Sequence, residues 1–204
     1  MKSWNRFKNS YLFYSFKRDP VAIFSFSALS VLVIISILAP VVAPYNTYDM
    51  ATIDIMDAET PPAWMEGGSE SFILGTDIQG RDLLSTMIYG LRVSLLIGVG
   101  AVLLQAVVGI LVGLLSGYLG GKLDAFLMRI ADIQFSIPYL IVAIFTSAIF
   151  KLAFGVGRYA ELAVPLLIII IGMSEWPKYA RTVRASVLGE KNKEYVEAAR
   201  VIGI

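Results

Sequence analysis

Residues 94–119, SLLIGVGAVLLQAVVGILVGLLSGYL, are the stretch of sequence that decides the fold. This run contains no charged residue, and it is longer than the about 20 residues that a helix needs to cross the hydrocarbon core of a bilayer. Working outward, three further apolar runs occupy residues 21–43, 125–150 and 162–176. The last is short for a span, but its pattern continues as far as Ala180. The sequence therefore predicts an all-α integral membrane protein with four spans.

The composition agrees with a membrane protein and argues against several kinds of enzyme. Hydrophobic residues make up 57% of the 204 residues and charged residues only 16%, whereas about 25% charged residues is usual in soluble domains. The chain has no cysteine and no histidine, which removes thiol nucleophiles, imidazole bases and the commonest zinc ligands. The net charge of +1 gives no reason to expect nucleic acid as a partner. We therefore expect no catalytic residue, no metal site and no cofactor bound by this chain.

Charge asymmetry predicts which side of the membrane each segment faces. Between residues 45 and 90 the acidic side chains are Asp49, Asp54, Asp57, Glu59, Glu66, Glu70, Asp77 and Asp82, against the single base Arg81. Basic side chains gather instead before the first run and after the last one, as Lys2, Arg6, Lys8, Lys17, Arg18, Lys178, Arg181, Arg184, Lys191, Lys193 and Arg200. The positive-inside rule assigns both basic regions to the cytoplasm and residues 45–90 to the outside.

These assignments divide the chain into five parts. The expected parts are a cytoplasmic basic arm at residues 1–20, a first span at 21–44, an outer loop at 45–93, a three-span core at 94–176 and a cytoplasmic segment at 177–204. The first apolar run is too long for the core of a signal peptide, so we expect it to be retained as a span.

Small residues and proline mark special positions within the spans. Gly109, Gly113 and Gly117 repeat every four residues and therefore share one helical face, which favours close packing against a neighbouring helix. The alternative is that glycine is simply frequent in membrane helices. Pro138 removes a backbone donor and should kink or locally unwind the third span. It is either a gate hinge or an ordinary structural kink.

Three polar residues interrupt the apolar runs. Gln105 either lines a substrate path or hydrogen-bonds a neighbouring helix, and helix packing is the more common role. Arg129 and Asp132 are three residues apart near the inner end of the third run. We interpret them as interfacial residues, paired or reaching the membrane edge, rather than as parts of an ion pathway.

The outer loop contains the motif GTDIQGRDLLS at residues 75–85. Its two glycines permit tight turns, Asp77 can cap the residues after it, and Arg81 lies between two aspartates, where it can form a local bidentate pair. The motif residues singled out here are Gly75, Asp77, Gly80, Arg81 and Asp82. By themselves they predict no more than an ordered loop.

The tail, EKNKEYVEAARVIGI at residues 190–204, reads as a short amphipathic helix. Tyr195, Ala198, Ala199 and Ile202 follow the i, i+3, i+4, i+7 rule. The small alanines leave room for a partner surface to come close, and Gly203 supplies the turn that ends the helix. We interpret this helix as a docking element on the cytoplasmic side. The alternative is a surface helix that packs on its own protein.

Together these segments resemble the permease subunits of ABC importers for dipeptides, oligopeptides, nickel and related solutes. The resemblance is carried by APVVAPY at residues 39–45, the Gly-Thr-Asp and Gly-Arg-Asp motifs, GYLGG at 117–121, Asp124, MRIAD at 128–132, Ile137 with Pro138, YARTVR at 179–184 and the tail helix. Its most specific part resembles the EAA loop of the family, with Glu197, Ala198, Ala199 and Gly203 at the positions of that motif.

The resemblance implies a fold, a function and partners. In the family, the EAA helix is a coupling helix that docks in a cleft on a cytoplasmic ATPase. By resemblance, the coupling residues are Glu194, Tyr195, Glu197, Ala198, Ala199 and Gly203. The implied protein is a type I importer permease-like helical bundle in a bacterial inner membrane, multi-pass, with its N-terminus in the cytoplasm. Its implied partners are a second homologous permease, two ATPases that bind ATP and a periplasmic solute-binding protein, and peptides are the expected solute.

The family pattern has six spans, of which four are present here. The resemblance therefore implies two further spans beyond Ile204, so we expect a fragment or a truncated product. An alternative function is a transport-inactive membrane anchor, or a truncated remnant, whose tail recruits a soluble partner.

Overall fold

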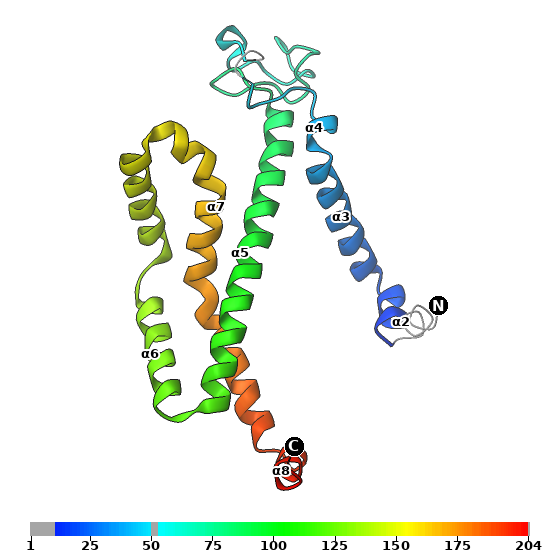
Figure 1. The fold of residues 1–204 in the computed structure, drawn as a ribbon. Helices are drawn as coiled ribbons and strands as arrows, with labels where there is room; N and C mark the ends of the chain where they lie inside the picture. The colour runs from blue at the N-terminus through cyan, green and yellow to red at the C-terminus, as the bar shows by residue number, and fades with distance from the viewer. Residues whose placement is uncertain (1–10, 50–52, 204) are drawn as a thin grey trace. The chain divides into compact units, whose positions relative to one another are not determined.

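The computed structural model describes residues 11–49 and 53–203, with the side chains of residues 11–13, 199 and 200 left aside. Lys2, Arg6 and Lys8, three bases of the expected cytoplasmic arm, lie outside the described residues. The helices are α2 (Tyr11–Arg18), α3 (Pro20–Ile37), α4 (Ala39–Val42), η2 (Ile55–Asp57, a 3-10 turn), α5 (Leu83–Leu119), α6 (Gly121–Ser136), α7 (Tyr139–Lys191) and α8 (Glu194–Val201) (Figure 1). Strand pairing in the described part is limited to one bridge between Thr76 and Asp82. The predicted all-α fold is confirmed.

The chain divides between Leu95 and Leu96 into two compact units, and α5 contributes to both. In the first unit, α3 begins where Asp19 caps it, because Oδ1 of Asp19 accepts a hydrogen bond from the N–H of Val21 at 2.9 Å. Pro20 occupies the first helical position, where a missing N–H costs nothing. Most apolar side chains of α3 are exposed within this unit, as expected for a helix whose solvent is lipid.

The first span ends earlier as a helix than the sequence predicted. Residues 21–44 were expected to be one span, but α3 stops at Ile37 and the short α4 follows from Ala39. The break falls at Leu38 (φ −84°, ψ 9°), two residues before Pro40, which cannot donate a hydrogen bond to the carbonyl four residues back. The C-terminal end of the apolar run is therefore a separate short helix.

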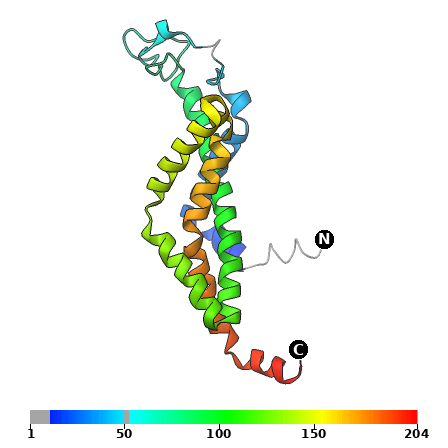
Figure 2. The ribbon, with the colours of Figure 1, turned by 60° about the vertical axis from the view of Figure 1, so that its left-hand side comes forward.

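In the second unit, α7 is two helices joined at a turn rather than one long rod. Gly155 has φ 77° and ψ 165°, which no α-helix tolerates, and the chain reverses its direction there (Figure 1). The first leg follows α6, and the second leg runs back past α5 toward α8 (Figure 2). The expected fourth span, residues 162–176, lies in this second leg.

The expected third span, residues 125–150, is divided between α6 and the first leg of α7. α6 ends at Ser136, and Pro138 stands immediately before α7 in an extended conformation (φ −60°, ψ 121°). The chain thus unwinds at this proline instead of continuing as a kinked helix. By length and composition, three helices of the described residues can cross a membrane, namely α3, α5 and α7.

The glycine row of α5 lies against the second leg of α7. A Cβ added to Gly109 would lie 2.4 Å from the Cβ of Tyr179, and one added to Gly113 would lie 2.6 Å from the carbonyl oxygen of Ala180. A Cβ at Gly117 would lie 2.8 Å from the Cβ of Val187. These separations are shorter than real Cβ contacts allow, so only glycine permits α5 and α7 to approach this closely.

The close approach creates the core of the second unit. Trp176 and Ala180 of α7 are buried together with Ala131 of α6, and Val108 and Val112 of α5 pack against them. α5, α6 and the second leg of α7 therefore share one apolar cluster next to the glycine row.

We predict that Gly113→Leu lowers the yield of folded protein, because a side chain at this contact must push α7 away at a cost of about 1–3 kcal/mol. Gly98→Leu is the matched control on the same helix, since a Cβ there meets no described atom within 4 Å. Yield and thermal stability in detergent are the measurements. Equal losses in the two variants would contradict the packing role of Gly113.

Candidate functional site

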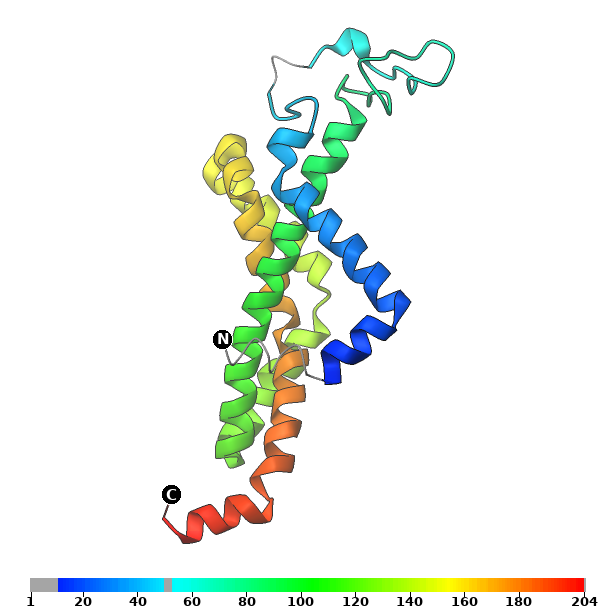
Figure 3. The same cartoon turned by 90° about the vertical axis from the view of Figure 1, so that its right-hand side faces the viewer.

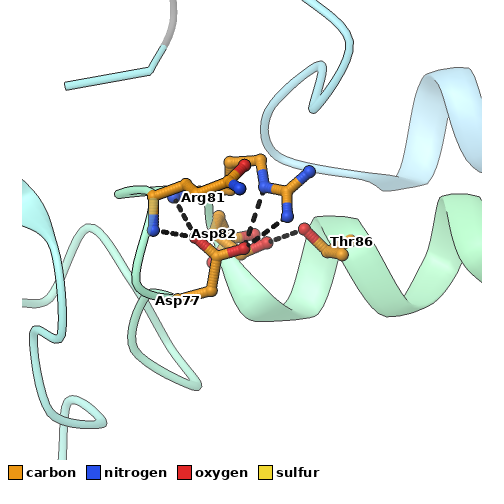
Figure 4. A network of polar contacts seen from close by, with 5 residues as sticks. Asp77, Arg81, Asp82 and Thr86 are labelled. Atoms are coloured by element: carbon orange, nitrogen blue, oxygen red, sulfur yellow. Dashed lines mark hydrogen bonds and ion pairs between the residues drawn. The ribbon is translucent and has the colours of Figure 1, made fainter. Parts of the chain in front are cut away.

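The outer-loop motif in the first unit is organised by the carboxylate of Asp77 (Figure 4). Oδ1 of Asp77 accepts hydrogen bonds from the N–H of Gln79 at 2.8 Å and of Arg81 at 3.0 Å. Oδ2 accepts from Nε of Arg81 at 2.8 Å, and a second guanidinium nitrogen of Arg81 lies at the same distance. Two guanidinium nitrogens of Arg81 thus converge on one carboxylate oxygen of Asp77, so the pair differs from the expected bidentate one, in which each nitrogen meets its own oxygen.

The glycines of this motif adopt conformations that other residues avoid. Gly75 has φ 80° and Gly80 has φ 77°. A Cβ at Gly80 would lie 1.9 Å from the carbonyl oxygen of Asp54, and one at Gly75 would lie 2.4 Å from that of Thr60. Both glycines therefore let distant parts of the loop lie backbone to backbone.

Asp82 is the residue that caps α5. Its Oδ2 accepts a hydrogen bond from the N–H of Ser85 at 2.7 Å, and its carbonyl accepts from the side chain of Thr86 at 2.8 Å (Figure 4). Asp77 caps the turn after it rather than the helix. Ser85 is fully buried and its Oγ accepts from the N–H of Tyr45 at 3.1 Å, which ties the start of the loop to α5.

Thr76 is a structural residue of this motif that the sequence reasoning did not single out. It is buried, and its Oγ1 accepts from the N–H of Thr60 at 2.9 Å while donating to the carbonyl of Asp57. Its own N–H donates to the carbonyl of Thr60 at 3.0 Å. Its position between Gly75 and Asp77 was the feature of the sequence from which this structural role could have been suspected. The outer loop is therefore held as an ordered unit by short polar contacts.

In the second unit, the tail helix is observed as α8, which turns away from the end of α7 (Figure 3). Glu190 stabilises the corner by accepting hydrogen bonds from Nζ of Lys193 and the hydroxyl of Tyr195, each at 2.5 Å. Gly203 follows the helix with φ 86°. This positive φ is the conformation expected of a glycine that terminates a helix.

Most residues assigned to coupling lie on the surface of α8. Glu194, Tyr195, Glu197, Ala198 and Gly203 are all exposed, whereas the side chain of Ala199 lies outside the described residues. Val201 and Ile202 are also exposed, by 88% and 74%. Among the described side chains of α8, Val196 is the half-buried one, and it helps to line a cavity of about 410 Å³ together with Leu114, Tyr118 and Val187.

A polar cluster anchors the helices immediately before α8. Nε of Arg184 in α7 donates to Oδ1 of Asp124 in α6 at 2.6 Å, and a second guanidinium nitrogen donates to Oδ2 at 2.6 Å. The hydroxyl of Ser116 in α5 donates to the same carboxylate. Nζ of Lys191 also donates to the carbonyl of Tyr118 at 2.8 Å. The ends of α5, α6 and α7 are therefore fastened together beside α8.

The sequence reasoning did not identify this cluster, because its members are far apart along the chain. Asp124 lies in the first turn of α6, outside the three long apolar helices. Hydrogen bonds from the side chains of Arg184 and Ser116 lower the pKa of Asp124 to about 2. The carboxylate therefore stays ionised, and the pair persists, throughout the physiological pH range.

Two other polar residues singled out from the sequence, Asp132 and Gln105, can be placed in the structure. Asp132 pairs with Arg181 of α7 at 2.6 Å rather than with Arg129, and the Arg181 guanidinium lies 4.5 Å from the ring centre of Phe135. Gln105 is buried, and its Oε1 accepts no hydrogen bond from a described residue. No group of three or more acidic side chains in the described part is arranged to hold a metal ion.

These features define a class: a multi-span helical membrane protein that has an ordered loop in its first unit and an exposed helix fastened to the end of its second. Comparison with models of protein families narrows this class to transport permeases. Residues 109–204 match the binding-protein-dependent transport system inner membrane component, and residues 10–62 match the N-terminal TM domain of oligopeptide transport permease C. The chain belongs to this family of transport permeases.

Several curated proteins are similar over nearly the whole chain. The dipeptide transport system permease protein DppC of Escherichia coli K12 is 40% identical over 92% of this chain, and the di/tripeptide transport system permease protein DppC of Pseudomonas aeruginosa is 37% identical over 93%. The oligopeptide transport system permease protein OppC of Bacillus subtilis is 32% identical over 99%. The matched region covers 58%, 58% and 59% of these relatives, respectively.

The carboxylate of Asp77 predicts a pH dependence of the outer loop. Burial acts to raise the pKa of Asp77, but hydrogen bonds from the backbone and side chain of Arg81 and from the backbone of Gln79 outweigh it, so this pKa is lower than usual. A carboxylate with a lowered pKa stabilises the fold above its unfolded pKa of about 3.9, and the stabilisation is lost as the pH falls through the folded pKa.

We therefore expect the backbone N–H groups of Gln79 and Arg81 to be protected from hydrogen exchange at neutral pH and to lose this protection below about pH 4. Asp77→Asn should lower the protection at neutral pH and remove its dependence on pH, whereas Glu66→Gln, at an exposed site of the same loop, should behave as wild type. Protection in Asp77→Asn equal to that of wild type at neutral pH would contradict the organising role of Asp77.

Proposed function

We propose that this chain is a permease subunit of an ATP-driven importer for peptides. The observation that carries the proposal is the identity of 32–40% over 92–99% of the chain to permeases named for dipeptide, di/tripeptide and oligopeptide transport. In this function the chain forms part of the transmembrane path together with a second homologous permease. A periplasmic solute-binding protein delivers the solute, and two cytoplasmic ATPases bind and hydrolyse ATP.

The geometry of α8 supports a coupling role within this function. α8 exposes Tyr195 and Val201, and Ile202 immediately after it is exposed as well, which leaves apolar surface for another protein to cover. Its corner is fixed by Glu190, and the helices before it are fastened by Arg184 and Asp124. A push on α8 by an ATPase would therefore reach α5, α6 and α7 together instead of being lost in a flexible linker.

The chain itself performs no covalent step in this proposal. Transport is a change between two access states, and the ATPases supply the free energy that favours one state over the other. α8 is the place where contacts with the ATPase differ between the two states. The N-terminus and α8 lie in the cytoplasm of the bacterial cell, and the Asp77 loop faces the periplasm.

We predict that Ala198→Trp and Gly203→Val reduce ATPase co-purification and solute uptake without reducing membrane insertion. The tryptophan adds a large ring to the exposed face of α8, and valine disfavours the positive φ of residue 203. Glu197→Ala is the milder comparison, because a charge at the rim of an interface contributes little. The assay should use the gene product at its native length with its partner subunits.

Two results would contradict the proposal in different ways. Wild-type co-purification and uptake in Ala198→Trp would mean that α8 does not dock. ATPase co-purification without any peptide-dependent uptake by the wild-type protein would instead favour a transport-inactive membrane anchor.

The proposed orientation can be measured separately with reporter fusions. A fusion after Glu66 should be active only with a periplasmic reporter, and a fusion after Lys191 only with a cytoplasmic one, because acidic loops are poorly retained inside and basic segments are poorly exported. The reverse pattern would overturn the orientation.

A further inference from the structure

One backbone carbonyl in the second leg of α7 lacks its usual helical partner. Pro177 lies inside this helix and its side chain is fully buried. Proline has no N–H, so the carbonyl of Met173, four residues earlier, receives no hydrogen bond from position 177. Where a helix crosses lipid, such a carbonyl must find another donor or pay a large desolvation penalty.

The missing donor is supplied by another helix. Nε2 of Gln134 in α6 donates a hydrogen bond to the carbonyl oxygen of Met173 at 2.9 Å. Gln134 thus takes the place of the N–H that Pro177 removes. Pro165, in the same leg of α7, provides a contrast, since no described side chain donates to the carbonyl of Glu161, four residues before it.

The surroundings of Gln134 make this hydrogen bond a mechanical link. Beyond Pro177, α7 is already joined to α6 by the pairs of Asp132 with Arg181 and Asp124 with Arg184. On the other side of Pro177, the contact with Gln134 joins the two helices three residues before the chain unwinds at Ile137.

The side chains around the hydrogen bond of Gln134 are not closely packed. A cavity of about 460 Å³ lies beside the contact and is lined by Ile130, Ile133, Gln134, Ile137, Val142 and Ser174. The side chains there leave space for α7 to change direction, so the hydrogen bond has more influence on its position than it would have in a closely packed core.

We propose that Gln134 is a positioning residue that sets the direction of α7 across Pro177. The segment after Pro177, which carries α8, then moves together with α6 and with the part of α7 before the proline. This inference rests on the proposed function for its use in transport: a displacement of α8, which α6 shares through its pairs with Arg181 and Arg184, is passed to the part of α7 before Pro177 by the hydrogen bond of Gln134. The link itself is a property of the second unit and can be tested without transport.

The structural test introduces Gln134→Met, which keeps the length of the side chain but removes the hydrogen-bond donor. The effect of this substitution is compared between the wild-type protein and the Pro177→Ala variant. Pro177→Ala restores an N–H to the helix, so the carbonyl of Met173 no longer needs Gln134. The chain has no cysteine, so spin labels can be placed at Phe126 in α6 and Ile169 in α7, both of which are exposed. The distance between them reports on the direction of α7 before Pro177 relative to α6.

We expect Gln134→Met to broaden and shift this distance distribution, and Gln134→Met/Pro177→Ala to give the distribution of Pro177→Ala alone. Pro165→Ala is the matched control background, in which Gln134→Met should act as it does in wild type. An unchanged distribution in Gln134→Met, or an equal effect in the Pro177→Ala background, would overturn the proposal.

The functional test uses the native-length protein assembled with its ATPases. Gln134→Met should lower the ratio of solute-stimulated to basal ATP hydrolysis by about threefold, the size expected for one hydrogen bond between membrane helices. Pro177→Ala should remove this dependence on Gln134. An unchanged ratio combined with an altered distance would overturn the coupling role. If wild type shows no solute stimulation, the proposed function fails, and the labels alone decide whether Gln134 positions α7.

Discussion

The need to satisfy every backbone N–H and C=O without water is the constraint on which this structure depends. In lipid, an isolated helix meets this need by itself, and for this reason the long apolar segments of the chain are helical. Each interruption then needs an explanation of its own. The helix breaks at Leu38, two residues before Pro40, and the chain reverses its direction at Gly155. Pro177 is tolerated within a helix because Gln134 donates a hydrogen bond to the carbonyl of Met173, which Pro177 leaves without its helical partner.

A second constraint arises because apolar side chains gain little from packing against each other when the solvent is also apolar. The second unit joins its helices by two other means. The glycines of α5 let α7 approach to backbone distance, and ion pairs such as that of Asp124 with Arg184 fasten the helices near α8. The first means gives close contact along the helices, and the second fixes their ends.

The sequence was informative wherever a property repeats along one segment. Hydropathy located the apolar runs, and the four-residue spacing of Gly109, Gly113 and Gly117 defined the face that lies against α7. The tail helix was recognisable from its own periodicity. Features that depend on two distant segments were not predictable in this way. Nothing near Asp124 indicates Arg184, and nothing near Gln134 indicates the carbonyl of Met173, since both contacts exist only after the chain has reversed at Gly155.

The second unit therefore differs in stiffness along its length. Beside α8, the pair of Asp124 with Arg184 and the contact of Lys191 with the carbonyl of Tyr118 bind α5, α6 and α7 into one body. Farther along, the chain unwinds at Pro138 after α6, and a cavity lies beside Gln134. Among the described residues, one side-chain hydrogen bond, that of Gln134, joins α6 to the part of α7 before Pro177. A force applied at α8 would displace the fastened end as a unit and would produce deformation where the contacts are fewest. The proline positions are thus the places where such a movement would change the shape of the protein.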